Sequence, residues 1–410
     1  MVLGSILLSL INSCTLQKES TPSPDLPVFS PTPSPIATLI ATSNPAATAT
    51  LSPTAMATDT ATPSQTPAIE PATETLRVNL INSIPLGKEG EVLSAMDDHN
   101  IYWIRFKDPG NMFRMPFNGG TPIKVITTKY DQGSLGFMFP SLTDHWIILG
   151  DTPNARSLND WTIRAVNTDN FSEKIILQST DHSASLFDFN FDVDGGVLVW
   201  SNRVLQSGKF AEDTVSRMNL NDGTAVELFR AEGDQAVWAM VKISKDIVVA
   251  EQDLKLNSTG VNNIYYFDSI HKQPVPLTTD GQSSMPDFSY PWVIWKSGPR
   301  FEFAQKITIY NLETEQKWLL LLPSVDNVDP KINGHFVYWT GYSSEDRKSC
   351  TLYIYNILKQ TIYRLPPAEN RCIKDVVIHG QMISWLRNEN FLSADNDAYL
   401  EWGILDNSIN

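Results

Sequence analysis

The sequence is poor in positive charge. Its 31 Lys and Arg stand against 46 Asp and Glu, which gives the 410-residue chain a formal net charge of −15. Nucleic-acid binding depends on clustered Lys and Arg, so this balance excludes a nucleic-acid partner. An acidic surface of this kind is typical of a protein that stays soluble outside the cell.

Several catalytic motifs are absent as well. The sequence contains no G-x-S-x-G, H-E-x-x-H, P-loop or C-x-x-C pattern, so serine hydrolase, zinc protease, nucleotidase and thiol-redox chemistry lack their usual support. The six histidines are scattered along the chain, which does not favour a metal cluster. From these absences we expect a protein that is not an enzyme and that uses no cofactor or metal.

Apolar runs long enough to cross a membrane as a helix are also missing. The N-terminal run covers about ten residues within 1–13, the length of a signal-peptide core. The segment Leu10-Ile-Asn-Ser-Cys14 that ends it resembles the lipobox of bacterial lipoproteins. The resemblance implies cleavage before Cys14 and acylation of Cys14, which would anchor the protein to a membrane. We therefore assign residues 1–14 to a signal peptide with a lipobox.

Residues 15–75 consist mostly of Thr, Ser, Pro and Ala. This segment holds eleven of the chain's 26 prolines and few charges, so it cannot bury enough apolar area to offset the entropy of ordering. We predict a disordered linker that acts as a stalk and precedes a folded domain over residues 76–410.

The folded domain shows an internal repeat. An apolar run that usually ends in Trp recurs about every 47 residues, and self-similarity at such a period indicates a propeller or solenoid. The seven runs cover residues 101–103, 146–149, 197–200, 247–250, 293–295, 336–339 and 382–385. An alternating strand follows each run, and no helical period of comparable length occurs. The fold class is therefore predicted to be all-β, a seven-bladed β-propeller rather than one of six or eight blades.

The last repeat ends after its third strand. The β-like run at residues 76–85 precedes the first repeat and has no place in it. We predict that this run supplies the fourth strand of the seventh blade, because closing the ring removes an exposed sheet edge.

Two repeats carry a family resemblance. The segments Ile307-Thr-Ile-Tyr-Asn-Leu-Glu-Thr-Glu and Thr351-Leu-Tyr-Ile-Tyr-Asn-Ile each follow a Val-Ile-Trp or Val-Tyr-Trp run. They resemble the repeats of TolB-like periplasmic propellers and of related WD40-like bacterial surface propellers. The resemblance implies a non-catalytic scaffold that binds other molecules, although fold analogy does not specify a ligand.

Four charged residues share one position in the repeat. Asp192, Lys242, Asp287 and Lys331 each stand eight residues before the last residue of an apolar run, on the predicted innermost strand. Their alternating signs predict a ring of ion pairs around the central channel. A polar channel that binds a ligand is the alternative.

Two cysteines bracket a predicted hairpin. Cys350 and Cys372 stand at the two open ends of this hairpin, so a disulfide between them is geometrically reasonable.

Together these observations predict an exported, lipid-anchored and monomeric propeller. We expect it to bind a protein or a cell-envelope polysaccharide through the long loops between second and third strands. The alternative is a glycoside hydrolase or polysaccharide lyase. Such an enzyme would use carboxylates at the propeller mouth, with Asp192, Asp287 and Glu345 as candidates.

Overall fold

The computed structural model of the chain describes residues 67–87, 92–105, 110–128, 134–135, 140–143, 145–152, 162–178, 190–206, 209–231, 237–253, 261–268, 270–271, 273–298, 306–322, 326–342, 349–366, 371–389, 397–406 and 409. The signal peptide with Cys14 and the stalk up to residue 66 lie outside this set and stay predictions. Within the set, no helix is long and apolar enough to cross a membrane.

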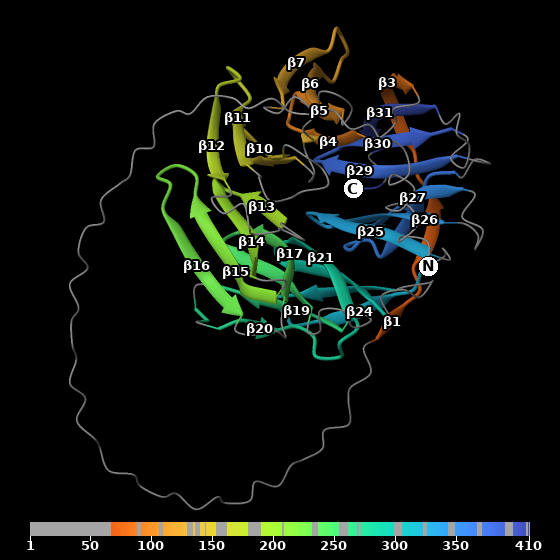
Figure 1. The fold of residues 1–410 in the computed structure, drawn as a ribbon. Helices are drawn as coiled ribbons and strands as arrows, with labels where there is room; N and C mark the ends of the chain where they lie inside the picture. The colour runs from red at the N-terminus through yellow and green to blue at the C-terminus, as the bar shows by residue number, and fades with distance from the viewer. Residues whose placement is uncertain are drawn as a thin grey trace, which may run out of the picture. The chain divides into compact units, whose positions relative to one another are not determined.

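The described strands form seven β-sheets, which are the blades of a propeller (Figure 1). Blade 1 contains β4 (Val92–Met96), β5 (Asn100–Arg105), β6 (Asn111–Pro116) and β7 (Ile123–Thr127); blade 2 contains β8 (Ser134–Leu135), β9 (Ser141–Thr143), β10 (Trp146–Thr152), β11 (Thr162–Asn167) and β12 (Glu173–Gln178); blade 3 contains β13 (Asn190–Asp194), β14 (Val197–Gln206), β15 (Lys209–Asn219) and β16 (Ala225–Ala231); blade 4 contains β17 (Val237–Ser244), β18 (Ile247–Asp253), β19 (Asn262–Phe267) and β20 (Val275–Pro276).

The remaining blades follow the same plan. Blade 5 contains β21 (Ser283–Ser289), β22 (Trp292–Ser297), β23 (Lys306–Asn311) and β24 (Lys317–Leu320); blade 6 contains β25 (Asp326–Asn333), β26 (Phe336–Tyr342), β27 (Cys350–Asn356) and β28 (Thr361–Arg364); blade 7 contains β29 (Cys372–His379), β30 (Met382–Asn388), β31 (Ala398–Leu405) and β3 (Val78–Gly87). The prediction of an all-β, seven-bladed propeller is confirmed.

In every blade the apolar run of the repeat lies in the strand that pairs with the innermost one; in blade 2 this is β10, which pairs with both β8 and β9. The run at 293–295, for example, lies in β22, where Val293, Ile294 and Trp295 are all 0% exposed. A strand in this position is covered on both faces by the neighbouring blades, so both sets of alternating side chains must be apolar. This is why a continuous run, and not an alternating one, marks these strands in the sequence.

The two ends of the folded region meet in blade 7. β3 pairs antiparallel with β31, which confirms the predicted closing role of the run at 76–85. The inner strand of blade 7, β29, in turn contacts β4 of blade 1. The ring is therefore closed by a strand from the N-terminal side of the domain.

Two short strands before β3 were not predicted. β1 (Ala68–Ile69) pairs in parallel with β24 at the outer edge of blade 5, and β2 (Ala72–Thr75) pairs in parallel with β28 of blade 6. Leu76 follows, and its amide donates to the carbonyl of Arg364 at 2.8 Å. We call residues 67–76 the strap. Most of the strap had been assigned to the linker, but its backbone groups pair with sheet edges that would otherwise be open.

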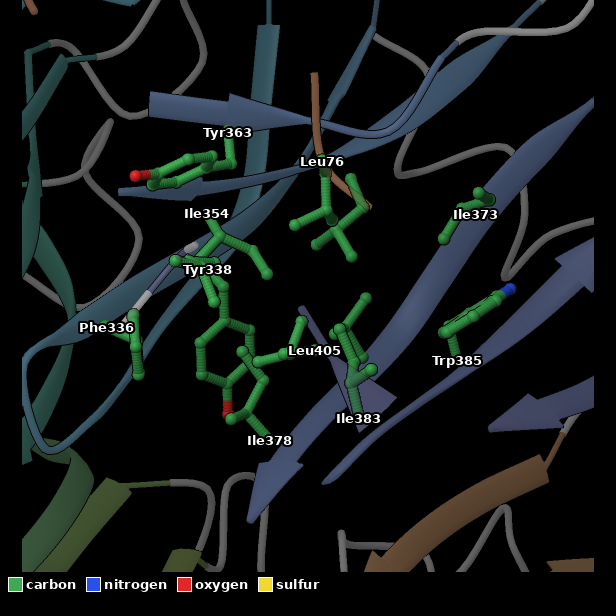
Figure 2. Packing of buried hydrophobic residues seen from close by; sticks show 13 residues of the cluster. Leu76, Phe336, Tyr338, Ile354, Tyr363, Ile373, Ile378, Ile383, Trp385 and Leu405 are labelled. Carbon is green, nitrogen blue, oxygen red and sulfur yellow. The ribbon is translucent and has the colours of Figure 1, made fainter. Parts of the chain in front are cut away.

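The hydrophobic core consists of layers between neighbouring blades. Figure 2 shows the layer between blades 6 and 7, where Tyr338 and Ile354 of blade 6 face Ile378 and Ile383 of blade 7. Leu76 of the strap is buried in the same layer. Since each such layer is formed by two blades, no blade buries its apolar faces alone.

Candidate functional site

A cavity of about 380 Å³ lies at the centre of the ring, and its lining includes residues of all seven innermost strands. One position of the repeat faces this cavity in every blade. We call these seven residues the axial ring. They are Ala95, Ser141, Asp192, Lys242, Asp287, Lys331 and Val377.

Strand alternation places the axial ring. Lys242, for instance, lines the cavity, whereas its neighbours Val241 and Ile243 are buried between blades. Successive side chains of a strand point to opposite sides. A charged side chain, which would be costly to bury between the blades, can therefore face the axis at this position. The structure therefore brings all four sequence-predicted charges to one cavity.

The axial ring has two unlike halves. Blades 3 to 6 contribute the four charged side chains, while blades 7, 1 and 2 contribute Val377, Ala95 and Ser141. These three side chains are short, so they leave the space that the cavity occupies. One wall of the cavity is thus charged and the opposite wall is small and largely apolar.

Lys242 is the centre of the charged wall. Its Nζ atom lies 3.5 Å from Oδ1 of Asp287, and the two side chains are 24% and 14% exposed. Burial disfavours the charged amine, but the carboxylates of Asp192 and Asp287 outweigh it and raise the pKa of Lys242. Lys242 is therefore a cation in contact with the cavity.

The two aspartates also join neighbouring blades through the backbone. Asp192 of blade 3 accepts a hydrogen bond from the Ile243 amide of blade 4 at 3.0 Å, and Asp287 of blade 5 accepts one from the Ile332 amide of blade 6 at 2.8 Å. Burial is the main reason that the pKa of Asp192 is raised. The sequence predicted side-chain ion pairs at this position but not these backbone bonds.

Lys331 differs from Lys242 in its balance of charges. Burial and the positive charge of Lys242 together lower the pKa of Lys331, while Asp287, Asp329 and Asp375 act in the opposite direction. The net shift is downward. The amine of Lys331 is therefore closer to its neutral form at physiological pH than an ordinary lysine is.

A second cavity of about 110 Å³ adjoins the first between blades 6 and 7. Asp329, Lys331 and Tyr338 line both cavities. Asp329 and Asp375 stand two residues before the axial ring on neighbouring blades, at register shifts, with φ angles of 49° and 51°. A bulge of this kind redirects a side chain from the regular alternation. Sequence reasoning missed these aspartates, although their common offset from the axial ring was readable.

The other predicted residues are placed as follows. Cys350 and Cys372 are joined in a disulfide, with Cα atoms 4.4 Å apart. Cys14 and Glu345 lie outside the described residues, as do most of the long loops expected to bind a partner. Residues 202–213, which the sequence predicts as the loop between the second and third strands of blade 3, belong largely to the long hairpin of β14 and β15. In the part of the chain that is described, no three His, Cys, Asp or Glu side chains are grouped so as to hold a metal ion.

The similarity of this chain to known proteins lies in its fold. No protein-family model and no curated protein sequence matches the chain. Among solved structures, the β-propeller domain of the Trilobed protease from Pyrococcus furiosus is similar at 10% identity, over 78% of this chain and 94% of that one, with a TM-score of 0.55. Oligogalacturonate lyase from Vibrio parahaemolyticus is similar at 9% identity, over 82% and 100%, with a TM-score of 0.54. The neighbours also include TolB from Acinetobacter baumannii, at 14% identity over 66% and 64%, with a TM-score of 0.44.

Other neighbours are peptidases. An acylaminoacyl peptidase in complex with a chloromethyl ketone is similar at 12% identity over 77% of this chain, with a TM-score of 0.56. The chain spans about half the length of the acylaminoacyl peptidases it matches, 51% and 49%.

These neighbours contradict the expectation that the protein is not an enzyme. Oligogalacturonate lyases and peptidases share the fold, so the fold does not imply a non-catalytic scaffold. The expectation was wrong because it relied on motifs that are read locally in a sequence. The central cavity is instead lined by residues of seven strands that are far apart in the sequence, so its lining has no contiguous signature.

Proposed function

We propose that the protein is an exported, polysaccharide-active enzyme that binds and cleaves its substrate in the central cavity. The axial ring is the observation that carries this proposal. The cavity that the axial ring faces has a volume of about 380 Å³, within the range of about 300–1,000 Å³ that is usual for ligand sites. Its charged wall supplies ammonium and carboxylate groups, which can bind hydroxyl and acidic groups of a saccharide and transfer protons.

The comparison with the lyases supports this choice over peptide hydrolysis. The similarity to oligogalacturonate lyase extends over 100% of the lyase chain, so whatever carries out catalysis there lies inside the matched fold. The similarity to the acylaminoacyl peptidase covers only 51% of that chain. The lyase comparison therefore relates a complete enzyme to this fold, whereas the comparison with this peptidase relates part of one.

Export and anchoring belong to the same proposal. The N-terminal run and the lipobox-like segment ending at Cys14 support secretion and acylation. The Cys350–Cys372 disulfide supports an oxidising compartment, where such bonds persist. In a bacterial host, we expect the full chain in the membrane fraction and a Cys14→Ala variant to lose incorporation of labelled fatty acid. Equal labelling of both proteins would contradict the anchor.

The enzymatic proposal is tested by turnover. The full chain is incubated with a panel of acidic and neutral polysaccharides, and newly formed reducing ends are measured. We expect turnover with at least one acidic polysaccharide and a large loss of it in Lys242→Leu, because the cation of the cavity is removed. An Arg230→Ala variant on the outer strand β16 is the matched control and should retain turnover. Binding without turnover across the panel would overturn the proposal.

A further inference from the structure

The axial ring presents two lysines whose pKa values are shifted in opposite directions. Lys242 is held as a cation by Asp192 and Asp287, whereas burial and Lys242 itself lower the pKa of Lys331. Both side chains line the same cavity. One lysine is therefore suited to bind an anion and the other to accept a proton.

A metal ion does not fit this site. One oligogalacturonate lyase structure is a complex with manganese, and it is similar to this chain at 13% identity with a TM-score of 0.52. Manganese prefers oxygen ligands such as carboxylates. Among the described residues no such group of three is present, and the two axial lysines would repel a cation. We therefore derive no step through a metal.

We infer that Lys331 and Lys242 together carry out a metal-independent β-elimination on a uronic-acid-containing saccharide, an inference that rests on the proposed function. In a uronate, the carbon that loses a proton carries a carboxylate. An ammonium beside that carboxylate stabilises the negative charge that develops when the proton leaves. Lys242 can provide this ammonium while it still contacts Asp287, because an ammonium has three donors.

The bond changes of the step balance as follows. The neutral amine of Lys331 takes the proton from C5 of the uronate, the electron pair forms the C4–C5 double bond, and the C4–O bond breaks. The departing oxygen takes a proton from the hydroxyl of Tyr338, which lines both cavities. Burial raises the pKa of Tyr338, so this hydroxyl is protonated before the step. Solvent then removes the proton from Lys331 and returns one to Tyr338.

The pH dependence follows from the groups that face Lys331. The cations are Lys242 and Lys374, the carboxylates are Asp287, Asp329 and Asp375, and the phenols are Tyr338 and Tyr342. Since the reactive form of Lys331 is the neutral amine, kcat/KM should rise with pH through the lowered pKa of Lys331. The rise should occur below the ordinary lysine value of 10.5.

The experiment uses the full chain with oligogalacturonate and with alginate, in the presence of a chelator. The expected product is unsaturated and absorbs in the ultraviolet, and the chelator leaves its formation unchanged. Reducing ends without the unsaturated product would indicate hydrolysis, which overturns this inference but leaves the proposed function standing. Loss of activity in the chelator, with recovery on adding metal, would also overturn it. No product of either kind on any polysaccharide would instead overturn the proposed function.

Three variants separate the roles of the lysines. Lys331→Arg keeps a charge but cannot give a neutral base, so kcat should fall about 10²- to 10⁴-fold. In Lys331→Ala, kcat should fall by the same factor. Added methylamine should partly restore it, because the free amine can replace the missing base, whereas it could not restore a structural role. Lys242→Gln should raise KM and lower kcat/KM by about 10- to 100-fold. The rise of kcat/KM with pH should remain, because Lys331 is still present. Full activity of Lys331→Arg, or no rescue of Lys331→Ala, would overturn the assignment of the base. Arg230→Ala is again the control.

Discussion

Two of the regions in which this propeller shields charged side chains from water use those side chains differently. Between blades 1 and 2, Arg164 and Asp151 form an ion pair at 2.6 Å, with side chains only 2% and 0% exposed. Asp151 also accepts from Thr128 at 2.6 Å, and Arg164 donates to the Thr127 carbonyl at 3.1 Å. In the axial ring, Lys242 and Asp287 are 3.5 Å apart and both reach a cavity.

The difference shows what makes buried charge available for chemistry. The Arg164–Asp151 pair is enclosed by protein partners, so it can only hold two blades together. The axial charges are partly desolvated but still face open space, and desolvation there shifts pKa values in a place that a ligand can reach. A charged side chain that is fully enclosed by protein partners stabilises the fold. A charged side chain that faces a cavity can contact a ligand.

The strongest test of this comparison is removal of the enclosed cation. Arg164→Leu leaves the Asp151 carboxylate buried without its ionic partner, and we expect a loss of about 3–5 kcal/mol in the free energy of unfolding. Urea unfolding followed by Trp fluorescence measures it. The double variant Arg164→Leu, Asp151→Leu should recover most of the loss, because the other carboxylate that contacts Arg164, Glu173, is 36% exposed and stays solvated by water. A single variant as stable as the parent would show that the pair is not structural.

A smaller effect is expected in the axial ring. Asp287→Ala removes the acceptor of the Ile332 amide, so it should cost about 1–3 kcal/mol of unfolding free energy. Asp287→Asn retains an acceptor oxygen and should cost clearly less. Urea unfolding of both variants, with hydrogen exchange at the Ile332 amide, separates the backbone bond from the ion pair. Equal losses in the two variants would assign the whole effect to the charge.

The two regions should also differ in their response to pH. Because the pKa of Lys331 is lower in the folded state, the folded protein binds fewer protons than the unfolded one between that lowered pKa and 10.5. The contribution of Lys331 to stability therefore rises with pH across this window. Lys331→Met should remove this slope, whereas Arg164→Leu should not, since arginine does not titrate there. Unfolding free energies of the three proteins across alkaline pH check this, and an unchanged slope in Lys331→Met would contradict it.

The smallest effect belongs to an exposed pair. Arg230 contacts Glu227 at 2.7 Å on the outer strand β16, with side chains 42% and 43% exposed. Arg230→Ala should change the unfolding free energy by only about 0.2–1 kcal/mol, because water already solvates both groups. The same urea titration measures it. A loss as large as that of Arg164→Leu would mean that enclosure is not what distinguishes the two pairs.

The sequence predicted those features that recur with the repeat. The seven apolar runs mark the second strands because each must be buried on both faces, and the position of Asp192, Lys242, Asp287 and Lys331 follows from counting along that repeat. Ring closure could be predicted because the last repeat lacks a strand. Each of these inferences needed only local pattern and position.

Features that depend on contacts between blades could not be predicted. In the strap, β1 and β2 pair with sheet edges through backbone groups, so their Ala- and Thr-rich sequence gives no pattern of a strand. The Arg164–Asp151 pair cannot be derived from the repeat, because the matching positions of blade 7, Glu401 and Arg387, form an ion pair of opposite signs. The opposite pKa shifts of Lys242 and Lys331 arise from charges on blades 3 to 7, which no single repeat encodes.

The strap determines how the ring would respond to a pull on its N-terminus. Tension would reach β1 first, which is held by two pairs of residues, then the four pairs of β2, and only afterwards the long seam between β3 and β31. The two outer strands would peel away in sequence while the seam stays shut. A propeller pulled at this end could thus lose β1 and β2 from the outer edges of blades 5 and 6 while its ring, and the central cavity within it, stays closed.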